Sequence, residues 1–211
     1  MSTYLTSYYP LCCTVKGRNA IQKNSDLKHY TDGSCRREPD FENEEPCITG
    51  LCRPGFAQKL VKYDIVVYVT NKRGVGSRKV VAILKVMKVF DNHKETAKWY
   101  RKHNKIIPNN IMVPGTKPFD LDKTHQKIGW NSWMKDASTL EEWDNYYLER
   151  ANSKFSSKVA QCKIIKIWLD VPIDLDDKDW RKISKRPLCT QNPPILKDEE
   201  WLKLVEKLKI T

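Results

Sequence analysis

The segment Gly129-Trp-Asn-Ser-Trp-Met134 has the residue types needed to hold a planar ring. Trp130 and Trp133 stand in a non-periodic stretch between polar residues, so core packing explains them less readily. Stacking a base on an aromatic face contributes about 1–3 kcal/mol, and Asn131 and Ser132 could read the base edge. The pattern predicts a pocket for an extruded base. The alternative is that both tryptophans fill the open end of a barrel.

Polar residues at the ends of two expected strands extend this predicted pocket. Ser7-Tyr8-Tyr9 follows a β-leaning run at Thr3–Thr6, and Tyr8 could stack on a base while Ser7 bonds to it. The alternative is an ordinary strand exit before Pro10. The strand expected at 63–70 ends in Thr70-Asn71, and these polar side chains could face the same pocket opening. The full predicted base pocket is Ser7, Tyr8, Thr70, Asn71, Trp130, Asn131, Ser132 and Trp133.

Positive charge is concentrated in the middle of the chain. The sequence has 38 Lys and Arg against 26 Asp and Glu, a net charge of +12. Residues 61–118 hold 13 basic and 3 acidic side chains, a net +10, whereas the flanking segments 1–60 and 119–211 are +1 each. Such a field attracts polyanions and gains from counterion release, although a solvated lysine-rich surface is the alternative. The predicted phosphate contacts are Arg53, Lys72, Arg73, Arg78, Lys79, Arg101 and Lys102.

One of these contacts has a constrained backbone. Arg53 precedes Pro54, which favours an extended backbone at the arginine. A guanidinium held in this way could bind a phosphate bidentately.

Four residues of the N-terminal third are candidates for a metal site. The spacings are His29-x5-Cys35, Cys35-x11-Cys47 and Cys47-x4-Cys52, and only the last approaches a usual ligand pair. No CxxC is present, so the sequence predicts no metal and no cofactor. The four residues stay candidates because the segment 16–56 needs some constraint if it is ordered.

Catalytic motifs are missing from the sequence. It has no GxSxG, no HExxH and no phosphate-binding glycine loop. His93, His103 and His125 have no acidic partner at a motif spacing. The acidic cluster of Asp174, Asp176, Asp177 and Asp179 fits a solvated helix-capping loop better than a nuclease metal site.

The length and hydrophobic pattern predict one domain over residues 1–211, with a long loop or insertion at 16–56 and a helical insertion at 119–158. Strands are expected at 63–70, 79–90 and 161–169, with a hairpin turn at 71–77. Helices are expected at 93–103, 138–153, 174–183 and 198–209, the last capped by Asp198. No apolar run suits a membrane span and the N-terminus has no signal-peptide pattern, so a cytoplasmic location without membrane contact is expected.

Several motifs together resemble a known superfamily. An Asp opens the run Tyr63-Asp64-Ile-Val-Val-Tyr, the next strand reads Val80-Val-Ala-Ile-Leu-Lys-Val, and a late Glu-Glu-Trp201 follows a proline-containing strand exit. This order resembles PUA-like domains of the EVE, ASCH and YTH kind, where Gly usually stands at the position of Tyr63. Cys52-Arg53-Pro54 before that strand is similar to nucleotide modification associated domains, which are often phage-encoded or bacterial.

The resemblance implies an α+β fold, a small mixed β-barrel flanked by helices. It also implies a pocket for an extruded, usually modified base on DNA or RNA. With the charge distribution, it predicts a nucleic-acid-binding module rather than an enzyme. A base-modifying enzyme on the same scaffold and a phage-type interaction protein are the alternatives, and the oligomeric state stays open.

Overall fold

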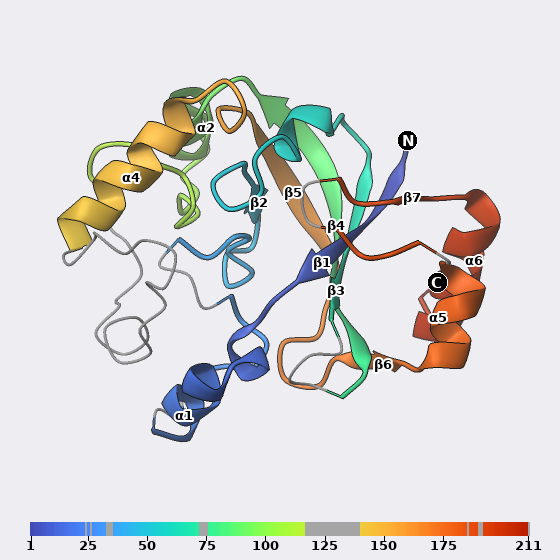
Figure 1. Ribbon diagram of the computed structural model, residues 1–211. Helices are drawn as coiled ribbons and strands as arrows, with labels where there is room; N and C mark the ends of the chain where they lie inside the picture. The colour runs from blue at the N-terminus through green and yellow to red at the C-terminus, as the bar shows by residue number, and fades with distance from the viewer. Residues whose placement is uncertain are drawn as a thin grey trace.

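A mixed β-sheet forms the centre of the molecule (Figure 1). The computed structural model describes residues 1–23, 25, 27–32, 36–71, 76–116, 140–184, 186–189 and 192–210. Over these residues seven strands form one sheet in the order β2-β5-β4-β3-β1-β7, with β6 also paired to β4. Their bounds are β1 Thr3–Tyr8, β2 Cys47–Ile48, β3 Ile65–Thr70, β4 Arg78–Phe90, β5 Val159–Ile167, β6 Ile173–Leu175 and β7 Ile195–Leu196.

The sheet is open within the described residues, because the strand order ends at β2 on one side and at β7 on the other. The mixed α+β class expected from the sequence is confirmed. The expected closed β-barrel is not confirmed, because the sheet does not close over the residues that the structure describes.

The three long strands lie close to their predicted positions because their sequences are rich in β-branched and aromatic residues. β3 pairs antiparallel with β4, and β4 pairs antiparallel with β5. β1 pairs with β3 in parallel, from Thr3 opposite Ile65 to Tyr8 opposite Thr70. Parallel strands end at the same edge of a sheet, so Tyr8 and Thr70 lie side by side where both strands stop.

Two C-terminal helices cover one face of the sheet (Figure 1). Helices α5 (Asp177–Ile183) and α6 (Asp198–Leu208) pack Trp180, Leu204 and Leu208 against the strands. The amphipathic C-terminal helix is thus confirmed, but the predicted cap Asp198 is already the first helical residue. Lys197 is the N-cap, and its backbone N–H donates to the Glu200 carboxylate at 2.8 Å.

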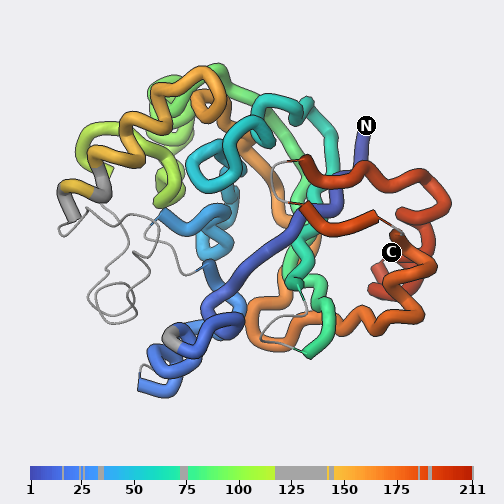
Figure 2. The backbone as a smooth tube through the Cα atoms, in the orientation of Figure 1, coloured from blue at the N-terminus to red at the C-terminus, as the bar shows by residue number. Residues whose placement is uncertain are grey.

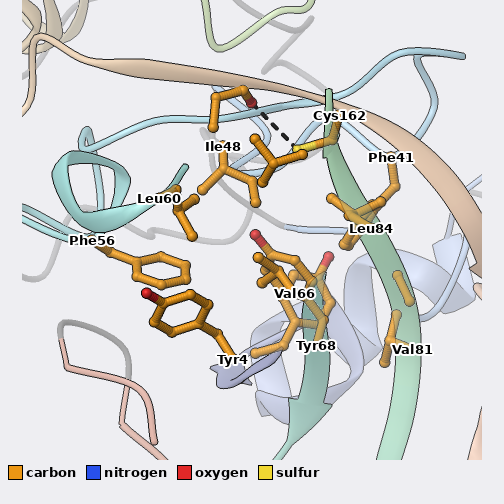
Figure 3. Packing of buried hydrophobic residues seen from close by; sticks show 14 of the residues in the cluster. Tyr4, Phe41, Ile48, Phe56, Leu60, Val66, Tyr68, Val81, Leu84 and Cys162 are labelled. Carbon is orange, nitrogen blue, oxygen red and sulfur yellow. Dashed lines mark hydrogen bonds between the residues drawn. The ribbon is translucent and has the colours of Figure 1, made fainter. Parts of the chain in front are cut away.

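The opposite face is covered by the segment that leads from α1 to β3. Phe56 packs edge-on against Tyr4, with ring centroids 5.6 Å apart (Figure 3). Ile48 and Leu60 from the same segment lie over Val66 in the buried cluster. A segment rich in proline and glycine thus supplies Phe41, Ile48, Phe56 and Leu60 to this hydrophobic core.

Helices α2 (His93–Lys102) and α4 (Leu140–Asn152) lie together at the β2 end of the sheet, away from α5 and α6 (Figure 2). Asn92 caps α2, and its side chain accepts from the Glu95 backbone N–H at 2.9 Å. Tyr147 of α4 packs on Leu51 and Met112. None of the helices in the described parts of the chain is long and apolar enough to cross a bilayer.

The prediction of an irregular segment from residue 16 was wrong at its start. Helix α1 covers Val15–Lys23, and a short 3₁₀ helix, η1, precedes it at Leu11–Cys13. The Thr14 hydroxyl accepts from the Gly17 backbone N–H at 2.8 Å, which is the geometry of a helix cap. Among the α1 residues whose burial is described, only Gly17, Ala20 and Ile21 are buried, so the apolar stripe is too short to be recognised from the sequence.

Candidate functional site

A buried group of polar and aromatic side chains lies where β1 and β3 end, beneath the 36–60 segment. We call it the polar centre and define it as Tyr8, Glu38, Phe41, Arg53 and Tyr68. All five are buried, and Tyr8, Glu38 and Tyr68 are 0% exposed. The strands contribute the two phenols, and the covering segment contributes the other three side chains.

Strand register explains why the two phenols meet. Side chains two residues apart share a face of a sheet, and so do directly paired residues. Thr6 pairs with Tyr68, and Tyr8 pairs with Thr70. Thr6, Tyr8, Tyr68 and Thr70 therefore all lie on the face that the 36–60 segment covers.

Three rings form the apolar part of the polar centre. Phe41 stands edge-to-face with Tyr8 at 5.4 Å between centroids and with Tyr68 at 5.2 Å, and the two tyrosines are 5.8 Å apart. Such T-shaped contacts are the favoured geometry for aromatic pairs. The rings are thus held in fixed orientations.

Arg53 lies against this aromatic group. Its guanidinium carbon is 5.6 Å from the centre of the Tyr68 ring. One terminal nitrogen donates to the Glu38 backbone carbonyl at 2.7 Å, and the other to the Ser7 carbonyl at 3.4 Å. Burial alone would lower the pKa of Arg53, but the neighbouring Tyr68 and Glu38 more than offset this and raise it. The arginine is therefore a buried cation and not an exposed phosphate clamp.

Glu38 holds the 36–60 segment in place through hydrogen bonds of its carboxyl group. One carboxyl oxygen accepts from the Thr49 backbone N–H at 2.8 Å, and the other contacts the Thr49 hydroxyl. The Asn110 amide donates to Glu38 at 3.4 Å and to the Cys47 carbonyl at 2.8 Å. Burial raises the pKa of the Glu38 carboxyl despite these bonds.

Several polar atoms of this region lack partners. Within the part of the chain that the structure describes, no hydrogen bond reaches the hydroxyls of Thr6, Tyr8 and Tyr68 or the Arg53 Nε. Burial raises the pKa of both phenols well above its usual value, so both stay protonated. An unsatisfied buried donor costs about 1–3 kcal/mol.

The structure divides the predicted base-pocket residues between the two faces of the sheet. Tyr8 and Thr70 lie on the face of the polar centre, where the Thr70 hydroxyl accepts from the Lys79 backbone N–H at 3.0 Å. Ser7 and Asn71 follow the opposite parity, and the Asn71 amide donates to the Ser7 hydroxyl at 3.0 Å. Trp130, Asn131, Ser132 and Trp133 lie outside the described residues.

The predicted phosphate contacts also separate. Arg78 and Lys79 form ion pairs with Asp177 and Asp174, and Arg78 lies 4.4 Å from the centre of the Trp180 ring. The remaining described pair is Arg101 and Lys102, exposed in the last turn of α2. Lys72 and Arg73 lie outside the described residues.

The acidic cluster at the start of α5 serves the fold. Asp176 is the N-cap of α5 and accepts from the Asp179 backbone N–H at 2.7 Å. The hydrogen bond and charge of Lys79 lower the pKa of Asp174. Both observations agree with the capping interpretation of this cluster.

The structure does not group the metal candidates that lie among the described residues. Cys47 is buried with its Sγ 3.3 Å from the Tyr100 hydroxyl, and the Cys52 Sγ lies 4.0 Å from the Tyr147 hydroxyl. His29 is exposed, and Cys35 lies outside the described residues. Among the residues that are described, no three His, Cys, Asp or Glu side chains are grouped so as to hold a metal ion.

One cleft has the wrong charge for a polyanion. It has a volume of about 470 Å³ and is lined by Asp40, Glu42, Glu44 and Glu45 against the single cation Lys105. A nucleic-acid backbone would be repelled from this side of the 36–60 segment.

Sequence reasoning missed Glu38, Phe41 and Tyr68. Tyr68 could have been found, because it has the same strand parity as Thr70. Glu38 and Phe41 belong to a segment without periodicity, so only the folded chain brings them to the strands. Comparison of the chain with protein-family models, with curated proteins and with solved structures finds no match.

Proposed function

We propose that this chain binds nucleic acid and holds one extruded, modified base at the polar centre of a PUA-like fold. The observation that carries the proposal is that the buried Tyr8 hydroxyl, Tyr68 hydroxyl and Arg53 Nε have no hydrogen-bond partner within the described residues. Base carbonyls and ring nitrogens are acceptors in the plane of the ring, and they match donors arranged around an aromatic group.

Charge supports the same partner. The +10 of residues 61–118 supplies long-range attraction for a phosphate backbone. The exposed cations Arg101 and Lys102 belong to this segment. They lie in the last turn of α2, where the helix dipole adds no positive charge, so the attraction comes from the two side chains alone. Binding should therefore weaken as salt rises.

Removing a single hydroxyl tests the base site without damaging the fold. The Tyr8 and Tyr68 hydroxyls have no partner among the described residues, so Tyr8→Phe and Tyr68→Phe should keep or raise the melting temperature. Each loses a hydrogen bond to the base, which weakens binding by up to about tenfold. Tyr100→Phe is the matched control, because that hydroxyl donates to the Glu45 carbonyl and its loss should lower stability but not affinity.

Fluorescence polarisation provides the readout. Short single- and double-stranded DNA and RNA are compared at two salt concentrations, plain or with 5-methylcytosine, 5-hydroxymethylcytosine or N6-methyladenine. A modified strand that binds more tightly to the wild type than to both Phe variants supports the base site. Equal affinity of all three proteins for every strand overturns it. Chemical change of a strand during incubation would instead indicate an enzyme.

A further inference from the structure

A row of lysines with one exposed tyrosine lies on the sheet face opposite to the polar centre. We call it the lysine strip, and its members are Lys62, Tyr63, Lys85, Lys163 and Lys166. In the β4–β5 register Lys85 pairs directly with Lys163, and Ile83 pairs with Lys166. These three lysines therefore share one face of the sheet, and the Lys85–Lys163 and Ile83–Lys166 pairs lie about 7 Å apart along the strand direction.

Strand parity shows that this face is not that of the polar centre. Lys85 also pairs with Ile65 of β3, and Ile65 belongs to the core under α5 and α6. Tyr68 of the polar centre pairs with Ala82, which belongs to the core on the other side. The lysine strip continues the α5–α6 face beyond the two helices, where β4 and β5 are exposed.

The lysines of the strip have no acidic partner within the described part of the chain. Among the described residues none of its four lysines forms an ion pair, although Lys79 and Lys105 elsewhere on the chain do. Like charges directly opposite each other on a sheet destabilise it. The Lys85–Lys163 pair is such an arrangement, and a bound anion would relieve the repulsion.

Tyr63 is held in an unusual position at one end of the strip. Its φ is 77°, a left-handed conformation that a residue with a side chain adopts at a cost of about 1–3 kcal/mol. Its backbone N–H donates to the Val86 carbonyl at 2.8 Å, which fixes the turn. Tyr63 is 47% exposed, and the Lys62 Nζ lies 4.7 Å and the Lys85 Nζ 5.3 Å from the centre of its ring.

We propose that the lysine strip is a second, independent surface that binds single-stranded nucleic acid. Tyr63 stacks an unpaired base, and Lys85, Lys163 and Lys166 contact successive phosphates. The combination of an exposed ring with a row of cations is the usual architecture for sequence-tolerant single-strand binding. An acidic protein or a bare polyanion would use the lysines but would have no use for the ring.

The key variant is Tyr63→Gly. Glycine adopts a positive φ without strain, so this change removes the ring and should leave the melting temperature unchanged or raised. Affinity for a short oligothymidylate should fall about tenfold or more. Affinity for an abasic strand of the same length should not change, because stacking needs a base.

The lysines are tested separately. Lys85→Ala/Lys163→Ala should lower the slope of log affinity against log salt by about 1.4, since each single-strand phosphate contact contributes about 0.7. The control is Lys178→Ala, an exposed lysine of α5 away from the strip. An unchanged slope in the double variant, an unchanged oligothymidylate affinity in Tyr63→Gly, or tighter binding of inorganic polyphosphate than of oligothymidylate would each overturn the proposal.

The two proposals fail separately. Tyr8→Phe changes only the polar centre and should leave oligothymidylate binding at the lysine strip unaffected. Tyr63→Gly should reduce binding of plain and modified strands by the same factor. A loss of modified-base preference in Tyr63→Gly would contradict the independence of the two faces.

Discussion

The stability of the fold should depend on pH through His93, the first residue of α2. Its ring is 3% exposed, its Nδ1 accepts from the Met112 backbone N–H at 3.1 Å, and its Nε2 faces the Ser156 carbonyl at 3.4 Å. Since Met112 donates, the proton must reside on Nε2. The neutral ring thus joins α2 to two other segments, and a second proton would break the bond from Met112.

The magnitude follows from the pKa. Burial lowers the pKa of His93 from 6.5 to about 4, so below pH 6.5 the unfolded chain takes up a proton that the folded chain refuses. At about 1.4 kcal/mol per pH unit, His93 costs about 3 kcal/mol of unfolding free energy as the pH falls from 6.5 to about 4. The stability that depends on neutral His93 is fully present above pH 6.5 and is lost as the pH falls from 6.5 to about 4.

Two carboxyl groups act in the opposite direction, so a difference measurement is needed. Burial raises the pKa of Glu38 and of Asp40, which makes the folded state bind protons more readily and gain stability as the pH falls. Both effects are common to the wild type and to His93→Gln, which keeps a donor and an acceptor but does not titrate. The difference between the unfolding free energies of the two proteins isolates the contribution of His93.

Urea unfolding followed by tryptophan fluorescence is the assay. The wild type should be more stable than His93→Gln near neutral pH, and the gap should shrink by about 3 kcal/mol on going to about pH 4 with similar m-values. A gap that stays constant would refute the claim that burial controls His93. A gap that widens on acidification would refute the sign of the argument.

Three further changes test the packing that positions both candidate surfaces, each by chemical denaturation. Asn92→Ala removes the cap of α2 and should cost about 1 kcal/mol, whereas Asn92→Ser should retain most of it. Gly50→Ala places a Cβ 2.5 Å from the Ser156 Cα, so the backbone must move and the midpoint should fall. Leu204→Ala empties a fully buried site under α6 and should cost about 2–5 kcal/mol. If the Asn92→Ala, Gly50→Ala or Leu204→Ala variant unfolded at the same denaturant midpoint as the wild type, the packing role assigned to that residue would be wrong.

Strong local patterns were enough to predict most of the regular structure. The β-branched runs of β3, β4 and β5 and the amphipathic stripe of α6 appear where the sequence indicates them. The N-cap of α6 was misplaced by one residue, because Glu200 reaches back to the Lys197 backbone and Asp198 is not needed as a cap.

Long-range contacts could not be predicted in the same way. The covering segment has its order from pairs such as Glu38–Thr49 and Glu38–Asn110, and nothing local in the sequence marks them. The predicted pocket placed Ser7 beside Tyr8 and ignored strand alternation, which sends the two side chains to opposite faces. The register between β1 and β3 was needed to decide which of them joins the polar centre.

Tyr63 joins the sequence argument to the structural one. Its φ of 77° is a left-handed conformation, which glycine adopts without strain. The turn is held regardless of the side chain, because the Asp64 carboxylate accepts from the Ser2 backbone N–H at 2.7 Å and from the Val61 N–H at 3.0 Å. A tyrosine here therefore adds strain without being needed for the turn. Its ring lies between Lys62 and Lys85, so under the proposal for the lysine strip the strain is offset by a stacking surface for an unpaired base.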